Sequence, residues 1–139
     1  MLACVVVAAL SEPGAAQPGA PATVAAGVAL FAGAQPLSAR LRGHDETLPA
    51  FAARCANCHV SQGTNSSLAP ILDRGSLTQL RSRRGGPASA FETDSFCRLL
   101  RTGIDPKDVL VASPMPVYHI ADEQCAALWA FLTRSEAGP

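Results

Sequence analysis

The sequence predicts an all-α domain, and two helical segments and the lack of any strand pattern support this prediction. The segment Asp122–Thr133 places its large apolar residues on one face at helical spacing and begins with two acids. The segment Thr93–Thr102 has the same periodicity and is followed by Gly103, a typical C-terminal cap. No segment shows the alternation of apolar and polar residues that is typical of a half-buried strand.

The other elements follow from turn-forming and helix-breaking residues. Gly33 ends the first helix, and Pro49 is tolerated in the first turn of the second. The expected helices are Ala25–Ala32, Leu48–Cys58, a short one within Asp73–Arg84, Thr93–Thr102 and Asp122–Thr133. Loops are expected over Gln35–Thr47, Ser61–Ser67 and Asp105–Ile120.

Residues 1–22 are expected to form a leader, and residues 23–139 a single domain. Leu2–Leu10 resembles the apolar core of a secretory signal, although no basic residue precedes it. Glu12–Ala22 is rich in Pro, Gly and Ala and is typical of a chain without regular structure. The apolar run is shorter than the roughly 20 residues that cross a bilayer, so we expect no stable membrane insertion. Cys4 as a lipid acceptor is a less favoured alternative.

The composition limits the classes of partner. The 139 residues include 11 basic and 11 acidic ones, and this zero net charge gives no reason to expect nucleic acid as a partner. Hydrophobic residues make up 48% of the chain but aromatic residues only 5%. A large apolar cofactor in the interior would therefore supply packing surface that few side chains provide.

Residues 55–59 form a CxxCH motif, which is the attachment signature of a c-type haem. The thiols of Cys55 and Cys58 can each add to one haem vinyl group, and His59 can then ligate the iron. A bare CxxC could also be a redox dithiol or half of a zinc site. The dithiol needs a strand–helix–strand context and the zinc site needs a second ligand pair, so haem is the preferred interpretation.

The iron also needs a sixth ligand or an open site, and Met115 is the preferred candidate. It is the one methionine outside the leader and lies between Pro114 and Pro116, which stiffen a loop that must hold a thioether against iron. His119 could replace it and give bis-histidine ligation, and His44 is a weaker candidate. Met115 could also simply fill a gap beneath a loop.

The combined pattern resembles the class I monohaem cytochrome c family over residues 48–132. The matching features are the CxxCH motif, Phe51 before it, Leu68–Leu72, Met115-Pro116 and a C-terminal helix with Trp129. The resemblance implies a cytochrome c-like helical domain wrapped around one haem c, covalently attached through Cys55 and Cys58, with His59 and Met115 as iron ligands. It also implies that the Pro70 carbonyl accepts a hydrogen bond from His59 Nδ1. Trp129 would pack near the crossing of the N- and C-terminal helices.

The start of the domain departs from the family pattern. Thr47 and Ala69 stand where family members often have glycine. A Gly27/Phe31 pair with the family spacing occurs earlier in the chain. Either the domain has an extra N-terminal helix, or its first helix is interrupted by an insertion at Gly33–Thr47.

Two further groups of residues have alternative interpretations. Cys97 and Cys125 lie on helices that should be close in this fold, and we favour a disulfide over two buried thiols. The run Arg74–Arg84 is interpreted as a solvated face. The alternative is that its arginines contact the haem propionates or an acidic redox partner.

These features predict a one-electron Fe(II)/Fe(III) carrier that is not itself an enzyme and is periplasmic or otherwise extracytoplasmic. Its partners would be redox proteins: a dehydrogenase as donor, and a terminal oxidase or another cytochrome as acceptor. Two alternatives stay open. One is a haem with an open sixth site that binds a small ligand or gas, and the other is the cytochrome subunit of a periplasmic dehydrogenase complex.

Overall fold

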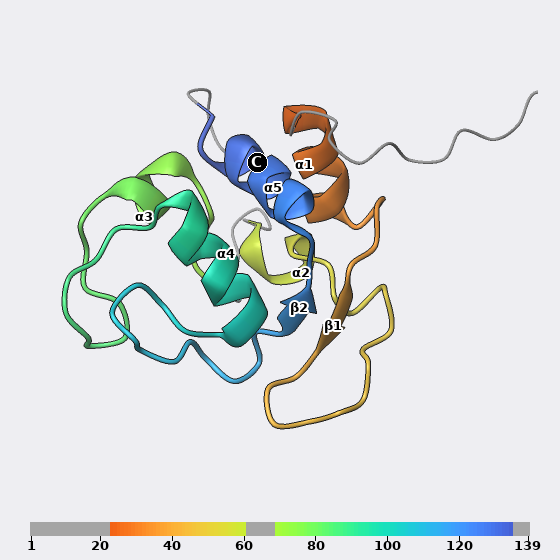
Figure 1. Ribbon diagram of the computed structural model, residues 1–139, viewed down its shortest axis with the longest axis horizontal. Helices are drawn as coiled ribbons and strands as arrows, with labels where there is room; N and C mark the ends of the chain where they lie inside the picture. Colours follow the sequence, from red (N-terminus) through yellow and green to blue (C-terminus); the bar gives the residue numbers. More distant parts are fainter. Residues whose placement is uncertain (1–22, 61–68, 135–139) are drawn as a thin grey trace, which may run out of the picture.

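The computed structural model describes residues 23–60 and 69–134, so the predicted leader 1–22 and the predicted loop Ser61–Ser67 lie outside the described residues. The helices are α1 (Val24–Ala32), α2 (Ala56–His59), α3 (Arg74–Thr78), α4 (Thr93–Thr102) and α5 (Asp122–Leu132), and the strands are β1 (Ser38–Arg40) and β2 (Val117–His119) (Figure 1). Within the described ranges, no helix is long and apolar enough to span a bilayer.

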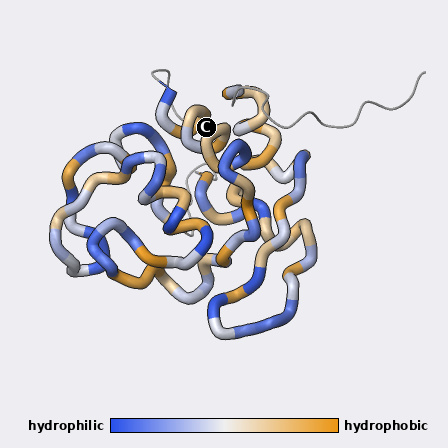
Figure 2. Tube along the Cα trace, viewed as in Figure 1, coloured by the Kyte–Doolittle hydropathy of each residue, from blue (hydrophilic) through white to orange (hydrophobic). Residues whose placement is uncertain are grey.

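The crossing of α1 and α5 forms one end of the core. Gly27 faces the backbone of α5, where a Cβ would overlap the carbonyl of Ala127, so glycine allows the two helices to approach closely. The rings of Phe31 and Phe131 pack beside this contact with their centroids 5.4 Å apart. Both helices are mostly apolar along their length (Figure 2). The Gly27/Phe31 pair therefore belongs to the helix that crosses the C-terminal one.

The predicted helix over Leu48–Cys58 is wrong. The chain from Leu48 to Cys55 is irregular apart from one turn, in which the Ala52 N–H donates to the Pro49 carbonyl at 2.8 Å, and only α2 is helical. Phe51, which would lie on the buried face of such a helix, is 67% exposed. Since α1 already occupies the crossing with α5, the first helix is followed by an insertion, and residues 23–55 form no second N-terminal helix.

The expectation of an all-α fold is also wrong, because a small antiparallel sheet joins two segments predicted to be loops. β1 pairs with β2 in a register that places Ala39 opposite Tyr118 (Figure 1). Each strand is three residues long, which is too short for alternation to be recognised in the sequence. The sheet ties the inserted segment after α1 to the segment that follows Met115.

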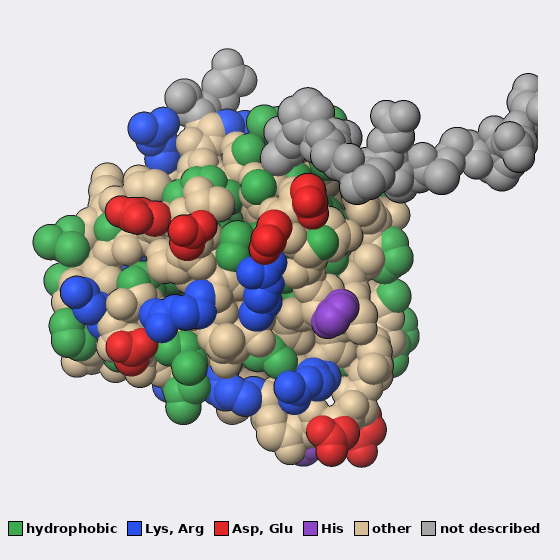
Figure 3. Space-filling view, in the orientation of Figure 1, with side chains coloured by type: hydrophobic (Ala, Val, Ile, Leu, Met, Phe, Trp, Pro, Cys, Tyr) green, Lys and Arg blue, Asp and Glu red, His purple; other side chains and the backbone are tan. Residues whose placement is uncertain are grey.

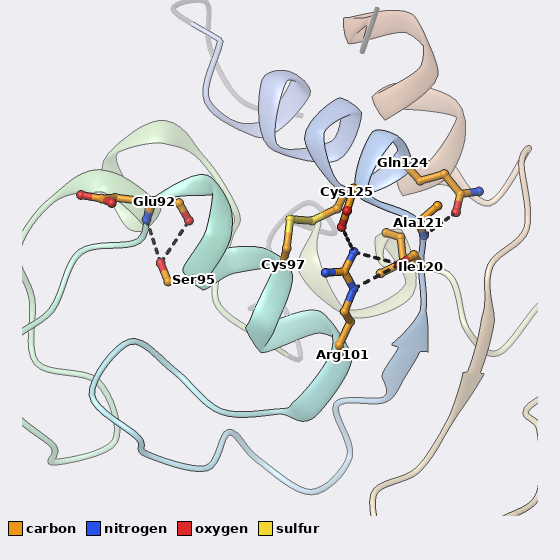
Figure 4. Close-up of a disulfide and its surroundings, with 9 residues drawn as sticks. Glu92, Ser95, Cys97, Arg101, Ile120, Ala121, Gln124 and Cys125 are labelled. Atoms are coloured by element: carbon orange, nitrogen blue, oxygen red, sulfur yellow. Dashed lines mark hydrogen bonds and ion pairs between the residues drawn. A yellow bond between two sulfur atoms is a disulfide. The ribbon is translucent and has the colours of Figure 1, made fainter. Parts of the chain in front are cut away.

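A disulfide joins α4 to α5, as predicted, between Cys97 and Cys125 (Figure 4). Their Cα atoms are 5.8 Å apart, and both side chains are buried. Trp129 packs against α4 instead of the α1–α5 crossing, with its ring 5.4 Å from that of Phe96. The reason is that Trp129 lies on the opposite side of α5 from Ala127.

Candidate haem site

The CxxCH residues form the short helix α2 together with its N-terminal cap, Cys55. The N–H groups of Cys58 and His59 donate to the carbonyl of Cys55 at 3.2 and 3.1 Å, which closes one helical turn around the motif. Both motif thiols are free; that of Cys55 is half-buried and that of Cys58 is exposed. Burial raises the pKa of the Cys55 thiol. The two sulfur atoms are thus presented from one turn, as attachment to one haem requires.

His59 is held by the segment that follows the undescribed residues 61–68. The Ala69 N–H donates to the Cys58 carbonyl at 3.0 Å, and His59 Nδ1 lies 2.8 Å from the carbonyl oxygen of Pro70. A carbonyl can only accept, so Nδ1 carries the proton and Nε2 is left with its lone pair. Burial lowers the pKa of the His59 imidazole, which favours the neutral, ligating form. Ala69 makes its bond to the Cys58 carbonyl through the backbone N–H, which does not depend on the side chain at this position.

Met115 lies at the end of a turn directly before β2. Its N–H donates to the Ala112 carbonyl at 3.0 Å, and its side chain is partly buried against the hydrophobic core. The thioether is therefore held at the core surface on a short turn. The joint role of His59 and Met115 as ligands stays a prediction.

Tyr118 belongs to the site but was not identified from the sequence. Its buried hydroxyl donates to the Ala53 carbonyl at 3.0 Å and also lies against the Cys55 thiol. Burial raises the pKa of the Tyr118 hydroxyl, which keeps it neutral. It is the only tyrosine in the chain and follows Met115-Pro116 closely, a signal that could have directed attention to it.

The residues of the site fit a haem group. The free Cys55 precedes α2 and the free Cys58 lies on it, while the other two described cysteines form the disulfide, so the motif thiols have no competing pairing within the described chain. An apolar side chain, Ile71, is 41% exposed directly after Pro70. An attached porphyrin needs two thiols, one imidazole with a free Nε2 and an adjoining exposed apolar surface, and the site offers each of these.

The alternative ligands His44 and His119 are both exposed. His119 lines a shallow cavity of about 350 Å³ on the two-stranded sheet, together with Arg40 and Arg101. Of the residues around the haem motif, this cavity includes only Tyr118. His119 therefore lines a cavity whose lining includes none of the CxxCH residues.

One arginine of the run Arg74–Arg84, Arg83, has its side chain bound within the fold. The Arg83 guanidinium donates to the Ser76 carbonyl at 2.8 Å and to the Ser89 hydroxyl at 3.0 Å, and it stacks over the Phe91 ring at 4.7 Å. Its donors are thus used inside the fold, whereas Arg74, Arg81 and Arg84 are exposed. Basic and acidic side chains are interspersed on the face shown in Figure 3, which matches the zero net charge.

Together, the motif thiols on α2, the oriented His59 and the Met-Pro turn define a small protein of the c-type haem class. A family model described as Cytochrome c matches residues 49–135. The chain therefore belongs to the cytochrome c family, whose members carry covalently attached haem and transfer electrons. No curated protein and no solved structure gives a significant match to it. Helix α1 precedes the matched range but supplies the crossing with α5.

Proposed function

We propose that the protein is an extracytoplasmic one-electron carrier with a single haem c ligated by His59 and Met115. The observation that carries this proposal is the bond between His59 Nδ1 and the Pro70 carbonyl at 2.8 Å, because it orients an imidazole whose Nε2 is free to bind iron. The proposal is further supported by the partly buried thioether of Met115 on the stiff Met-Pro turn.

The residues have distinct roles in this proposal. Cys55 and Cys58 form the thioether bonds that fix the haem to α2, and Pro70 keeps His59 in one tautomer. When bound, the haem supplies a one-electron Fe(III)/Fe(II) couple. Met115 offers a soft sulfur ligand, which favours the reduced metal and a positive potential. Because both ligands come from anchored segments, neither needs to move during electron transfer.

The location and the partners are part of the same proposal. The disulfide between Cys97 and Cys125 supports an oxidising compartment such as the periplasm. A dehydrogenase would donate the electron, and a terminal oxidase or another cytochrome would accept it. Fractionation of the native host would locate the protein, and co-purification would distinguish a free carrier from a subunit of a dehydrogenase complex.

A single substitution in the holoprotein tests the ligand assignment. Met115→Ala should leave the haem attached, because the thioether bonds and His59 remain, but should remove the far-red sulfur–iron band of the oxidised protein and allow CO to bind the reduced one. Ser113→Ala, an exposed neighbour on the same loop, is the matched control and should change neither property. A Met115→Ala protein with an unchanged low-spin spectrum would exclude Met115 as a ligand.

A further inference from the structure

The loop that carries Met115 is held at its base by an arginine from the inserted segment after α1. The half-buried Arg42 donates from Nη2 to the Val111 carbonyl at 2.8 Å and from Nη1 to the Gly103 carbonyl at 3.4 Å. The Val111 N–H itself donates to the Gly103 carbonyl at 2.9 Å, so these two residues lie side by side at the base of the loop. The Arg42 guanidinium binds both of their carbonyls. Hydrogen bonds from a charged donor are among the stronger ones in proteins.

Gly103 is shaped to admit this guanidinium. Its φ of 73° is in the left-handed region, and a Cβ at this position would collide with Arg42 Nη1. The same glycine that ends α4 thus leaves the space in which Arg42 reaches across to the Met115 loop. From Val111 the chain runs directly into the turn that ends with the Met115 N–H on the Ala112 carbonyl.

A second anchor holds the other side of Met115. β2 begins two residues after Met115 and pairs with β1 of the inserted segment, which places Tyr118 opposite Ala39. The Tyr118 hydroxyl then reaches the carbonyl of Ala53, two residues before Cys55. This bond connects the chain after Met115 directly to the segment that attaches the haem.

We propose that Arg42 and Tyr118 are positioning residues that hold Met115 at the iron, one from each side of its loop. This inference rests on the proposed function, since it assumes that Met115 is a ligand. Neither side chain needs to touch the metal. Arg42 binds backbone carbonyls at the base of the loop that presents the thioether, and Tyr118 ties the chain after Met115 to the Ala53 carbonyl beside the haem motif. The inserted segment between α1 and α2 thereby anchors the loop that carries Met115.

Competition with imidazole measures how firmly Met115 is held. Imidazole can bind the ferric holoprotein only when Met115 is off the iron, so its apparent affinity is proportional to the population with Met115 dissociated. Loss of a charged hydrogen bond or of the tyrosine hydroxyl should raise that population about tenfold. The readout is the imidazole concentration that removes half of the far-red sulfur–iron band.

Three variants and one control make the test specific. Arg42→Gln and Tyr118→Phe should each lower the imidazole dissociation constant about tenfold, while Arg42→Lys, which keeps the charge but not the two-pronged donor, should give a smaller decrease. Arg40→Gln is the matched control, because it leaves the backbone pairing of β1 with β2 in place and the Arg40 side chain donates only to the His44 carbonyl within its own segment. It should bind imidazole like the wild type. Tyr118→Phe removes one hydroxyl and keeps the proposal testable if Arg42→Gln does not fold.

The outcomes separate the two levels of the proposal. Arg42→Gln and Tyr118→Phe proteins that melt at a lower temperature yet bind imidazole with wild-type affinity would show that the two residues only stabilise the fold, and would overturn the inference. A wild-type holoprotein that lacks the far-red band would overturn Met115 ligation itself, and this inference with it. A tenfold change in both variants, with Arg40→Gln unchanged, supports the positioning role.

Discussion

The disulfide between Cys97 and Cys125 should stabilise the protein mainly by closing the loop that contains Met115. The two cysteines are separated by 28 residues. For a loop of this length, the chain-entropy model gives a loss of about 12 cal/mol/K for the unfolded chain, or roughly 3.5 kcal/mol at 25 °C. Replacing both cysteines by alanine also leaves a small cavity, since Cys125 is 0% and Cys97 7% exposed, and this should add about 1 kcal/mol.

Guanidinium denaturation of the oxidised holoprotein measures this loss. We expect the variant Cys97→Ala/Cys125→Ala to have a free energy of unfolding about 4.5 kcal/mol lower than that of the wild type. A thiol reductant cleaves the disulfide but also reduces the haem, so the thiol-treated wild-type protein is compared with wild-type protein whose haem alone is reduced by ascorbate. The two samples share both sulfur atoms and the ferrous iron and differ only in the cross-link, which isolates the loop contribution. A difference below about 1 kcal/mol in both comparisons would refute the reasoning from loop closure.

Two further substitutions test the packing. Gly27→Ala should destabilise the protein by about 1–3 kcal/mol despite better helix propensity, because its methyl group would overlap the Ala127 carbonyl; thermal unfolding without a lower midpoint would contradict the tight α1–α5 crossing. Asp122→Asn should change stability by less than about 0.5 kcal/mol, since this carboxylate is 87% exposed in its ion pair with Arg101. Arg101→Gln should cost about 1 kcal/mol, because its guanidinium also donates to the Ile120 carbonyl at 3.0 Å; equal effects of the two changes would show that the backbone bond is unimportant.

The sequence predicted the elements whose stability is local. Helix α4 has the predicted bounds and α5 ends one residue early, because both combine an apolar face with clear end signals. The helix predicted over Leu48–Cys58 is wrong because its stability would depend on a distant contact. The segment has a helical pattern, but α1 already occupies the surface of α5 on which it would pack. The sheet could not be predicted, since β1 and β2 are short and far apart in the chain.

In the site, too, the residues marked by a local pattern could be predicted and those that act over long distances in the sequence could not. The motif residues of α2 and the Met-Pro turn could be identified because their chemistry depends on residue type and spacing. Arg42 and Tyr118 could not, because each acts on backbone carbonyls of a segment distant in sequence. An arginine in a polar loop and a tyrosine after a turn have no pattern that marks them. Only the folded chain brings Arg42 to the base of the Met115 loop and the Tyr118 hydroxyl to Ala53.

The most direct test of His59/Met115 ligation is the optical spectrum of the purified holoprotein, oxidised, reduced, and reduced under CO. We expect a low-spin ferrous spectrum that CO does not change at neutral pH, and a weak far-red sulfur–iron band in the oxidised protein. Prompt CO binding or a high-spin spectrum would show that the sixth position is available. It would contradict a carrier with two fixed ligands in favour of a haem protein that binds small ligands.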